Sequence, residues 1–304
     1  MIKSNHRIRL HKKGPELSAL ASGMWRLHEW NFKTDDLHSF IEDCITLGVT
    51  TFDHADIYGD YGNESLFGKV LTRNPALRDK IEIVTKCGIC LPVQNRPEYQ
   101  VQHYNTSVDH LRDSVERSLR NLKTDFLDLV LIHRPDPLMH AESILELFLK
   151  LKEEGKVLHF GVSNFTPPQF SLFQSVADLP VVTNQVEFSL AHLDPIYDGT
   201  FDQLQAEGSS PMLWSPFAGG ELFHSDSERM RRIRSAASPV MEKTGSTLDQ
   251  VALAWCRMLP IKPLPVLGTG KIERVEAAVH SLDIELERQD WYRLLEASNG
   301  HPVP

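Results

Sequence analysis

Several features are scarce or missing in this chain, and each absence excludes a class of protein. The 304 residues contain only four cysteines, which are too few for the disulfide framework of a small secreted protein. No apolar run approaches the roughly 18–20 residues that a membrane-spanning helix requires. Basic residues (32) are fewer than acidic residues (41), so the formal net charge is −9. Nucleic acids and anionic membranes bind basic faces, and we therefore expect neither as a partner.

Signals of disorder and of targeting are missing too. Hydrophobic residues make up 41% and charged residues 24% of the chain, values typical of globular proteins. The N-terminal segment has no apolar stretch, so we expect no secretory signal peptide and a cytoplasmic location. No linker or low-complexity tract divides the chain, and one (β/α)8 barrel of about 250 residues or more fits this length. We therefore expect a single domain over residues 1–304.

The chain does contain a repeated alternation of short apolar runs and segments with helical periodicity. Eight runs predict strands: Leu17–Met24, Val49–Asp53, Ile81–Lys86, Phe126–His133, Lys156–Val162, Val181–Val186, Pro211–Ser215 and Leu264–Leu267. Each precedes a helical pattern, which is clearest over residues 106–122. Eight strand–helix repeats favour an α/β fold closed into a parallel (β/α)8 TIM barrel. Residues 7–10 predict an N-terminal β-hairpin, and residues 288–298 predict an extra C-terminal helix.

Polar side chains are concentrated where these predicted strands end. Asp53, Lys86 and His133 close three consecutive strands, and Tyr58 follows Asp53 shortly afterwards. Active sites of such barrels lie at the C-terminal ends of the strands, so we expect these side chains to meet. A neighbouring ammonium lowers the pKa of a tyrosine, a carboxylate keeps the lysine charged, and a histidine can bond a substrate oxygen. The set suits protonation of a carbonyl oxygen as hydride arrives at its carbon.

Each of these residues also has a purely structural interpretation. Asp53 could cap a helix, Tyr58 could pack on the surface, and His133 could be a hydrogen-bonded core histidine. Lys86 differs, because an ammonium at the end of an apolar strand is costly to bury without a partner. The presence of all four residues at the correct strand ends is what favours a functional site.

The last predicted strand–helix junction contains a candidate phosphate site. Gly268-Thr269-Gly270 lies at a helix start, with Lys271 and Arg274 close behind. Such a turn presents backbone N–H groups and the positive end of the helix dipole to a phosphate. The junction matches neither the dinucleotide fingerprint nor the Walker loop, so a nucleotide would bind here in a non-Rossmann manner. The alternative is an ordinary helix start with a solvated basic face.

Segments spread over the whole chain resemble the aldo-keto reductase superfamily, and within it the bacterial oxidoreductases of the YdhF type. These segments are TFDHADIYG, EIVTKCG, LDLVLIHRPDP, GKVLHFGVSNF, TNQVEFS and PVLGTGKIERV. The resemblance implies a barrel enzyme that uses NADP(H) to reduce small-molecule aldehydes or ketones. The residues themselves predict no metal, because the chain shows no cluster of His ligands, and no required protein partner is expected. The same subgroup also resembles potassium-channel β-subunits.

The resemblance also implies roles for individual residues. Tyr58 would be the general acid, tuned by Lys86 and Asp53, and His133 would orient the substrate carbonyl. The residues expected to bind the cofactor are Ser163, Asn164, Gln185, Trp214, Ser215, Phe217, Gly219, Gly220, Leu222, Gly268, Thr269, Gly270, Lys271 and Arg274. The first three match positions that bind the nicotinamide carboxamide, and the fourth matches the aromatic residue stacked on the nicotinamide ring.

Two departures from the family pattern concern the adenosine end of the cofactor. Gly268 stands where many relatives have lysine, and Ala277-Ala278 stand where they have a Glu-Asn pair that contacts adenine. Lys271 and Arg274 still favour the 2′-phosphate through charge-assisted hydrogen bonds. We therefore prefer NADP(H) to NAD(H), with weaker adenine anchoring.

Three alternatives stay open at this point. Trp25 could line the substrate pocket or simply pack at the rim. Cys87 and Cys90 have the spacing of a redox or zinc motif but lack its context, although oxidation of Cys87 could disturb Lys86. The protein could also be an NADP(H)-binding regulatory module with negligible turnover. A hydrolase using Asp53 and Glu187 is disfavoured, because Glu187 lies past its strand.

Overall fold

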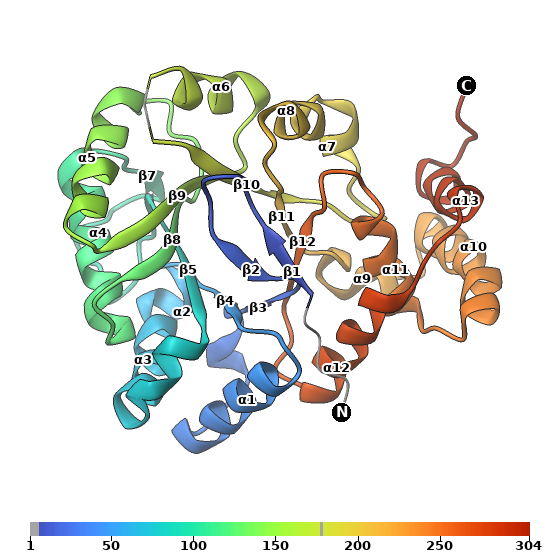
Figure 1. Cartoon of the computed structure of the whole chain (residues 1–304), viewed down its shortest axis with the longest axis horizontal. Helices are drawn as coiled ribbons and strands as arrows, with labels where there is room; N and C mark the ends of the chain where they lie inside the picture. The colour runs from blue at the N-terminus through green and yellow to red at the C-terminus, as the bar shows by residue number, and fades with distance from the viewer. Residues whose placement is uncertain (1–5, 177–178) are drawn as a thin grey trace.

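The computed structural model describes residues 6–176 and 179–304, and a closed barrel of eight parallel strands forms its centre (Figure 1). The barrel strands are β3 (Ala21–Gly23), β4 (Thr51–Asp53), β5 (Glu82–Cys87), β8 (Leu127–Ile132), β9 (Val157–Ser163), β10 (Val181–Glu187), β11 (Met212–Trp214) and β12 (Leu264–Leu267). They neighbour each other in chain order, and β12 pairs with β3 to close the ring. The predicted (β/α)8 TIM barrel is confirmed.

Helices surround the barrel and pack their apolar faces against the strands (Figure 1). They include α1 (Thr34–Thr46), α3 (Asn63–Arg73), α4 (Val108–Leu122), α5 (Ala141–Glu153), α6 (Pro167–Ser175), α8 (Thr200–Glu207), α11 (Leu248–Arg257) and α12 (Ile272–His280). Local signals set where they begin: the Ser107 side chain accepts from His110 N at the start of α4, and Thr166 and Gln169 form a capping box on α6. Short helical turns complete the chain, namely η1 (Leu27–Glu29), α2 (Tyr58–Tyr61), η2 (Pro75–Lys80), η3 (Ala218–Gly220), α9 (Glu221–His224) and η4 (Ser281–Asp283).

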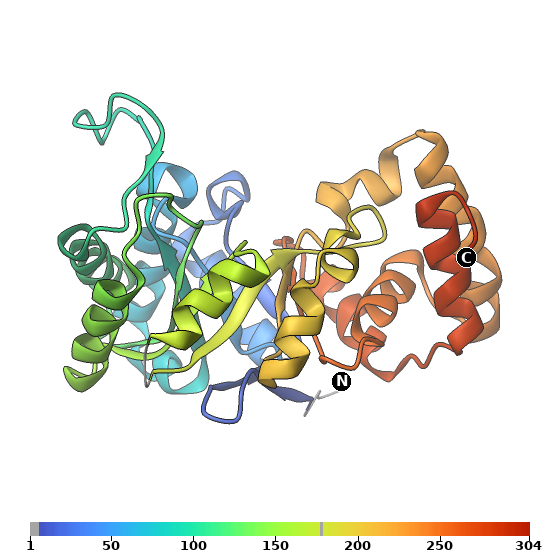
Figure 2. The ribbon, with the colours of Figure 1, turned by 90° about the horizontal axis from the view of Figure 1, so that it is seen from above.

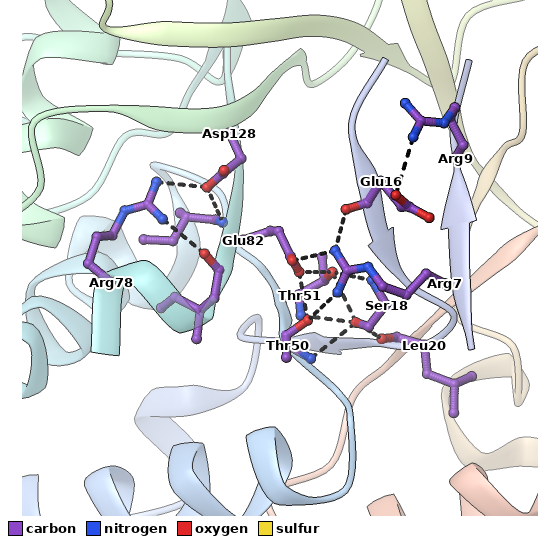
Figure 3. Close-up of polar contacts among 12 residues, drawn as sticks. Arg7, Arg9, Glu16, Ser18, Leu20, Thr50, Thr51, Arg78, Glu82 and Asp128 are labelled. Atoms are coloured by element: carbon purple, nitrogen blue, oxygen red, sulfur yellow. Dashed lines mark hydrogen bonds and ion pairs between the residues drawn. The ribbon is translucent and has the colours of Figure 1, made fainter. Parts of the chain in front are cut away.

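The predicted first strand, Leu17–Met24, is wrong as one continuous strand. Glu16–Ser18 forms β2, which pairs antiparallel with β1 (Arg7–Arg9), and only Ala21–Gly23 enters the barrel. Ser18 explains the break: its hydroxyl donates to Leu20 O at 2.6 Å and accepts from Thr51 N at 3.0 Å (Figure 3). The predicted hairpin therefore exists, but its second strand comes from the first half of the run assigned to the barrel.

The β1–β2 hairpin closes the end of the barrel where the strands begin. Its Leu10 and Leu17 belong to the apolar cluster that fills the barrel interior. Arg7 Nη2 donates to Glu82 Oε1 at 2.6 Å and also contacts the Glu16 carbonyl, which ties the hairpin to the start of β5 (Figure 3). Polar contacts thus hold the hairpin over the N-terminal end of the barrel. The C-terminal ends of the strands, where active sites of such barrels lie, stay open.

Two further helices pack together on one side of the barrel, beside α11 (Figures 1 and 2). They are α10 (Glu228–Thr244) and α13 (Arg288–Asn299), and Trp291 of α13 stacks on Trp255 of α11 with ring centroids 5.1 Å apart. The predicted extra C-terminal helix is thus confirmed. Between β10 and β11 the chain forms two helices, α7 (Asp194–Tyr197) and α8, separated at Gly199, whose φ of 87° ends the helical path.

The antiparallel strand pair that follows β5 was not predicted from the sequence. After β5 the chain forms a small antiparallel pair, β6 (Ile89–Cys90) with β7 (His103–Tyr104), and the intervening residues 91–102 project from the barrel as a loop (Figure 2). We refer to residues 91–102 as the rim excursion. Across the described part of the chain, no helix combines the length and apolar character needed to cross a membrane.

Candidate functional site

Asp53, Lys86 and Tyr58 meet at the C-terminal ends of β4 and β5. Lys86 Nζ donates to Asp53 Oδ2 at 2.7 Å, to the carbonyl oxygen of His54 at 2.8 Å and to Tyr58 OH at 3.2 Å. The ammonium therefore has three partners, although the Lys86 side chain is only 1% exposed. The close approach of these three residues, predicted from the strand ends, is present.

Burial and charge act in opposite directions in this triad. Burial alone lowers the pKa of a lysine, but Asp53 and Tyr58 outweigh it and raise the Lys86 pKa above its ordinary value. Burial raises the pKa of Tyr58 above 10, and the opposing charge of Lys86 is not large enough to reverse this. The sequence analysis expected Lys86 to lower the Tyr58 pKa. Lys86 does act in that direction, but the larger effect of burial makes the net shift upward. The raised pKa favours the neutral phenol of Tyr58, which is the form that donates a proton.

His133 lies beside Tyr58 just beyond β8. The two rings are perpendicular, with centroids 5.9 Å apart, and His133 N donates to Cys87 O at 2.9 Å, which extends the β5–β8 ladder. Burial, followed by the charges of Lys86 and Arg134, holds the His133 pKa well below its ordinary value. The imidazole is therefore neutral, and a neutral imidazole can donate one N–H to a substrate oxygen.

The predicted carboxamide-binding residues form a hydrogen-bonded chain around the barrel mouth. Asn164 Nδ2 donates to Ser163 Oγ at 2.8 Å, and Asn164 Oδ1 accepts from Trp214 Nε1 at 3.0 Å. Gln185 Nε2 donates to Asp53 Oδ1 at 2.8 Å, a bond that sequence reasoning missed. Glu187, expected past its strand, is instead the last residue of β10, so its position is no argument against the hydrolase alternative. With Lys86 on Oδ2, however, both oxygens of Asp53 are engaged, which disfavours that alternative.

The donors and acceptors left over fit a nicotinamide carboxamide. No described residue donates to Gln185 Oε1, so this oxygen can accept from the carboxamide N–H groups. Asn164 Nδ2 makes one short bond to Ser163 and one long bond, 3.4 Å, to His133 O, so it can donate to the carboxamide oxygen. Trp214 is held by its indole N–H and offers a ring face, over which Arg134 lies 5.8 Å from the centroid.

The segment after β11, which is predicted to pass a pyrophosphate, turns sharply. It contains the predicted residues Ser215, Phe217, Gly219, Gly220 and Leu222. Gly219 and Gly220 have φ values of 64° and 103°, a region that favours glycine. The Leu222 side chain is 2% exposed and packs in the core, so only its backbone could face a cofactor.

The junction between β12 and α12 contains the other predicted cofactor residues. A Cβ at Gly268 would meet nothing within 4 Å, whereas a Cβ at Gly270 would lie 2.5 Å from the Trp30 indole. Packing therefore requires glycine at position 270 whether or not a nucleotide binds. Thr269 Oγ1 accepts from Lys271 N at 3.2 Å. Lys271 and Arg274 are exposed and form no ion pair with any described residue, which leaves both cations available to a phosphate.

The remaining predicted features lie around the rim and beneath it. Trp25 is 56% exposed, and its carbonyl accepts from Asn63 Nδ2 at 3.0 Å, so its role toward substrate stays a prediction. Cys87 and Cys90 are buried free thiols, and burial raises the pKa of Cys87 well above its ordinary value, which makes the thiol unreactive. Within residues 6–176 and 179–304, no group of three His, Cys, Asp or Glu side chains is placed to hold a metal ion.

Comparison with known proteins identifies the class of this barrel. The sequence model of the Aldo/keto reductase family matches residues 19–299. The chain belongs to this family of oxidoreductases, which generally use NADH or NADPH to reduce carbonyl compounds. The predicted resemblance is thereby confirmed.

Individual relatives match over nearly the whole chain. Oxidoreductase YdhF of Escherichia coli (strain K12) is 48% identical over 299 residues, covering 98% of this chain and 99% of that protein. A 6-dehydroglucose reductase of Agrobacterium fabrum is 43% identical over 290 residues, covering 95% of this chain and 96% of that protein. The crystal structure of a thermostable aldo-keto reductase with the inhibitor epalrestat matches with a TM-score of 0.80 at 25% identity, covering 96% of this chain and 99% of that one.

Proposed function

We propose that this protein reduces an aldehyde or ketone to an alcohol with NADPH, and that Tyr58 is the general acid. The observation that carries the proposal is the buried Tyr58–Lys86–Asp53 chain, with distances of 3.2 and 2.7 Å. A phenol held beside a charged ammonium can release its proton at the moment a carbonyl oxygen becomes negative.

Tyr58, Lys86, Asp53 and the residues around them would each have a separate role in the reaction. A nicotinamide held at this site would supply the hydride for the carbonyl carbon. Tyr58 donates its hydroxyl proton to the carbonyl oxygen, and Lys86 stabilises the phenolate that remains while Asp53 keeps Lys86 charged. His133, neutral because of its low pKa, donates an N–H to the same oxygen and orients it. Asn164, Gln185 and Trp214, described above, would hold the nicotinamide.

The preference for NADPH is supported by Lys271 and Arg274. Both are exposed cations beside the start of α12 in a chain of net charge −9, and neither is neutralised by a described acidic residue. A guanidinium binds a phosphate through two parallel hydrogen bonds. NADPH has a phosphate at its 2′ position and NADH does not, so only NADPH can form this pair of bonds.

The substrate class is suggested by a relative. The similar Agrobacterium protein is named a 6-dehydroglucose reductase, so a hydroxylated aldehyde is the first substrate to test. The experiment follows NADPH consumption by the purified protein with 6-dehydroglucose and a panel of short aldehydes and ketones. Tryptophan fluorescence measures NADPH binding separately.

The decisive variant is Tyr58→Phe, which removes only the proton donor. We expect NADPH affinity to be unchanged and reduction to fall by about 10²–10⁴-fold. The matched control is Tyr292→Phe, at an exposed tyrosine on α13, which should behave as wild type. Full turnover by Tyr58→Phe would contradict the assignment of the acid. Tight NADPH binding without turnover of any carbonyl would favour the regulatory-module alternative.

A further inference from the structure

The three residues that follow Tyr58 all have a left-handed backbone. Their φ angles are 57° at Gly59, 53° at Asp60 and 67° at Tyr61. Residues other than glycine rarely adopt this conformation, so the turn at Asp60 and Tyr61 is strained and has to be held by contacts outside itself. Tyr58 opens the turn, and the position of its phenol therefore depends on how firmly the turn is held.

On one side, those contacts come from the rim excursion. Asn95 Nδ2 donates to the carbonyl oxygen of Asp60 at 2.6 Å, and Leu91 N donates to Tyr61 OH at 2.9 Å. The guanidinium carbon of Arg96 lies 4.6 Å from the centroid of the Tyr61 ring, a cation–π contact. All three contacts reach the two strained residues that are not glycine.

On the other side, the turn is held by Asn63. Its Nδ2 donates to Met24 O at 2.8 Å and to Trp25 O at 3.0 Å, which anchors the turn to the end of β3. A Cβ at Gly59 would lie 2.0 Å from Asn63 Oδ1, so only glycine leaves room for this anchor. The turn is therefore clamped between the β3 end and the rim excursion, and the excursion itself begins shortly after Lys86 in the chain.

Arg96 also acts on the segment that precedes Tyr58. Both carboxylate oxygens of Asp56 are buried, and neither has a hydrogen-bond partner among the described residues; the same holds for Arg96 Nε. Burial, followed by the charge of Glu64, raises the pKa of Asp56 well above its ordinary value; Arg117 and, to a smaller extent, Arg96 oppose the rise. Arg96 thus contacts Tyr61 after Tyr58 and has only a minor electrostatic effect on Asp56 before it.

We propose that Arg96 is a positioning residue for Tyr58: together with Asn95 it holds the left-handed turn, so that the phenol faces Lys86 and His133. This inference rests on the proposed function of Tyr58 as the general acid. Proton transfer depends steeply on distance and alignment, so a small displacement of the hydroxyl slows the reaction. We expect NADPH binding to be unaffected, because no hydrogen bond, ion pair or ring contact joins the described residues 91–102 to a residue assigned to the nucleotide.

The test compares Arg96→Ala with wild type in NADPH-dependent reduction. We expect kcat per NADPH-binding site to fall about tenfold while the KM for NADPH stays constant. The solvent deuterium isotope effect on kcat should rise, because transfer of the Tyr58 proton then limits the rate more strongly. A merely structural role would reduce the number of binding sites but leave kcat per site and the isotope effect unchanged, and this result would overturn the proposal.

Further variants keep the test decisive if Arg96→Ala folds poorly. Asn95→Ala removes one hydrogen bond at an exposed position and should lower kcat about threefold. Arg96→Lys keeps a cation over the Tyr61 ring and should recover much of the lost rate. The control is Gln94→Ala, at the exposed neighbouring position, which should match wild type. Wild-type kcat in both Arg96→Ala and Asn95→Ala would refute the positioning role.

The Tyr58→Phe background separates this inference from the proposed function. If Tyr58 is the acid, adding Arg96→Ala to Tyr58→Phe should cause no further loss, because there is no phenol left to position. Full turnover by Tyr58→Phe alone would mean that the proposed function is wrong. A strongly impaired Tyr58→Phe with a fully active Arg96→Ala would mean that only the positioning role is wrong.

Discussion

The side chain of Gln185 donates a 2.8 Å hydrogen bond to Asp53, although the two residues stand on opposite sides of the barrel. Gln185 belongs to β10, on the side expected to hold the nicotinamide, and Asp53 ends β4, on the side of the proposed acid. The second atom of the same amide, Oε1, is open to a carboxamide. If Gln185 binds the carboxamide as proposed, one side chain links cofactor binding to the charge on the Tyr58–Lys86–Asp53 chain.

This linkage predicts a combined effect of Gln185→Leu. The variant removes the hydrogen bond to Asp53 and the acceptor for the carboxamide, so NADPH affinity and kcat should both fall, each by about tenfold. Fluorescence titration gives the Kd and steady-state assays give kcat. Gln205→Leu, at an exposed glutamine of α8, is the matched control. A change in Kd with no change in kcat would show that the bond to Asp53 has no catalytic effect.

The pKa shifts predict the pH dependence of both reaction directions. Reduction needs protonated Tyr58 and neutral His133; burial raises the Tyr58 pKa and lowers the His133 pKa. The kcat for reduction should therefore stay flat from about pH 6 to 9 and fall only as pH rises through the raised Tyr58 pKa. Alcohol oxidation uses the deprotonated tyrosine as base, so its rate should rise with pH. An alkaline decline of reduction near neutral pH would contradict this.

The basic pair at the start of α12 predicts nucleotide selectivity. Arg274→Ala should raise the Kd for NADPH about tenfold and leave the Kd for NADH nearly unchanged, because only NADPH has a 2′-phosphate. The loss should shrink at high salt, which screens exposed charges. Arg288→Ala, at an exposed arginine on α13, is the control. Equal weakening of both nucleotides would show that Arg274 does not contact the 2′-phosphate.

A buried histidine predicts loss of stability in acid. His54 is fully buried with its ring 4.6 Å from that of Phe67, and burial, aided by the charge of Lys86, lowers its pKa from 6.5 to about 3. The unfolded chain therefore takes up this proton first, and the folded state loses stability as pH falls from about 6.5 toward 3. His54 alone accounts for about 4–5 kcal/mol over that range.

Urea unfolding at pH 7 and at pH 4 measures this effect. His54→Phe keeps a ring against Phe67 and cannot be protonated, so the loss of unfolding free energy between the two pH values should be smaller than in wild type. His280→Phe, at an exposed position of α12, should leave the pH dependence unchanged. An equal loss in His54→Phe and wild type would show that His54 does not cause the acid sensitivity.

The errors of the sequence-based prediction have local physical causes. Leu17–Met24 has the composition of one strand, but the hydrogen bonds of Ser18 with Leu20 and Thr51 turn the chain within it. Most side chains of the rim excursion are exposed, so its sequence has no periodic apolar face. No hydrophobic pattern therefore predicted this loop. The role of Gly270 toward the cofactor stays a prediction. The contact with Trp30 that also requires glycine there comes from a distant part of the chain, so no sequence pattern indicated it.

The sequence by itself determined the order of strands and helices, the barrel, and the polar residues at the strand ends, because apolar periodicity and turn residues act over short distances. It also carried the family resemblance. Only the tertiary structure decided which side chains meet and which effect dominates: that Gln185 reaches Asp53, that burial outweighs Lys86 at Tyr58, and that Arg96 lies over the Tyr61 ring. Hydrogen bonding and desolvation depend on the distances between side chains far apart in the chain, and closure of the barrel sets those distances.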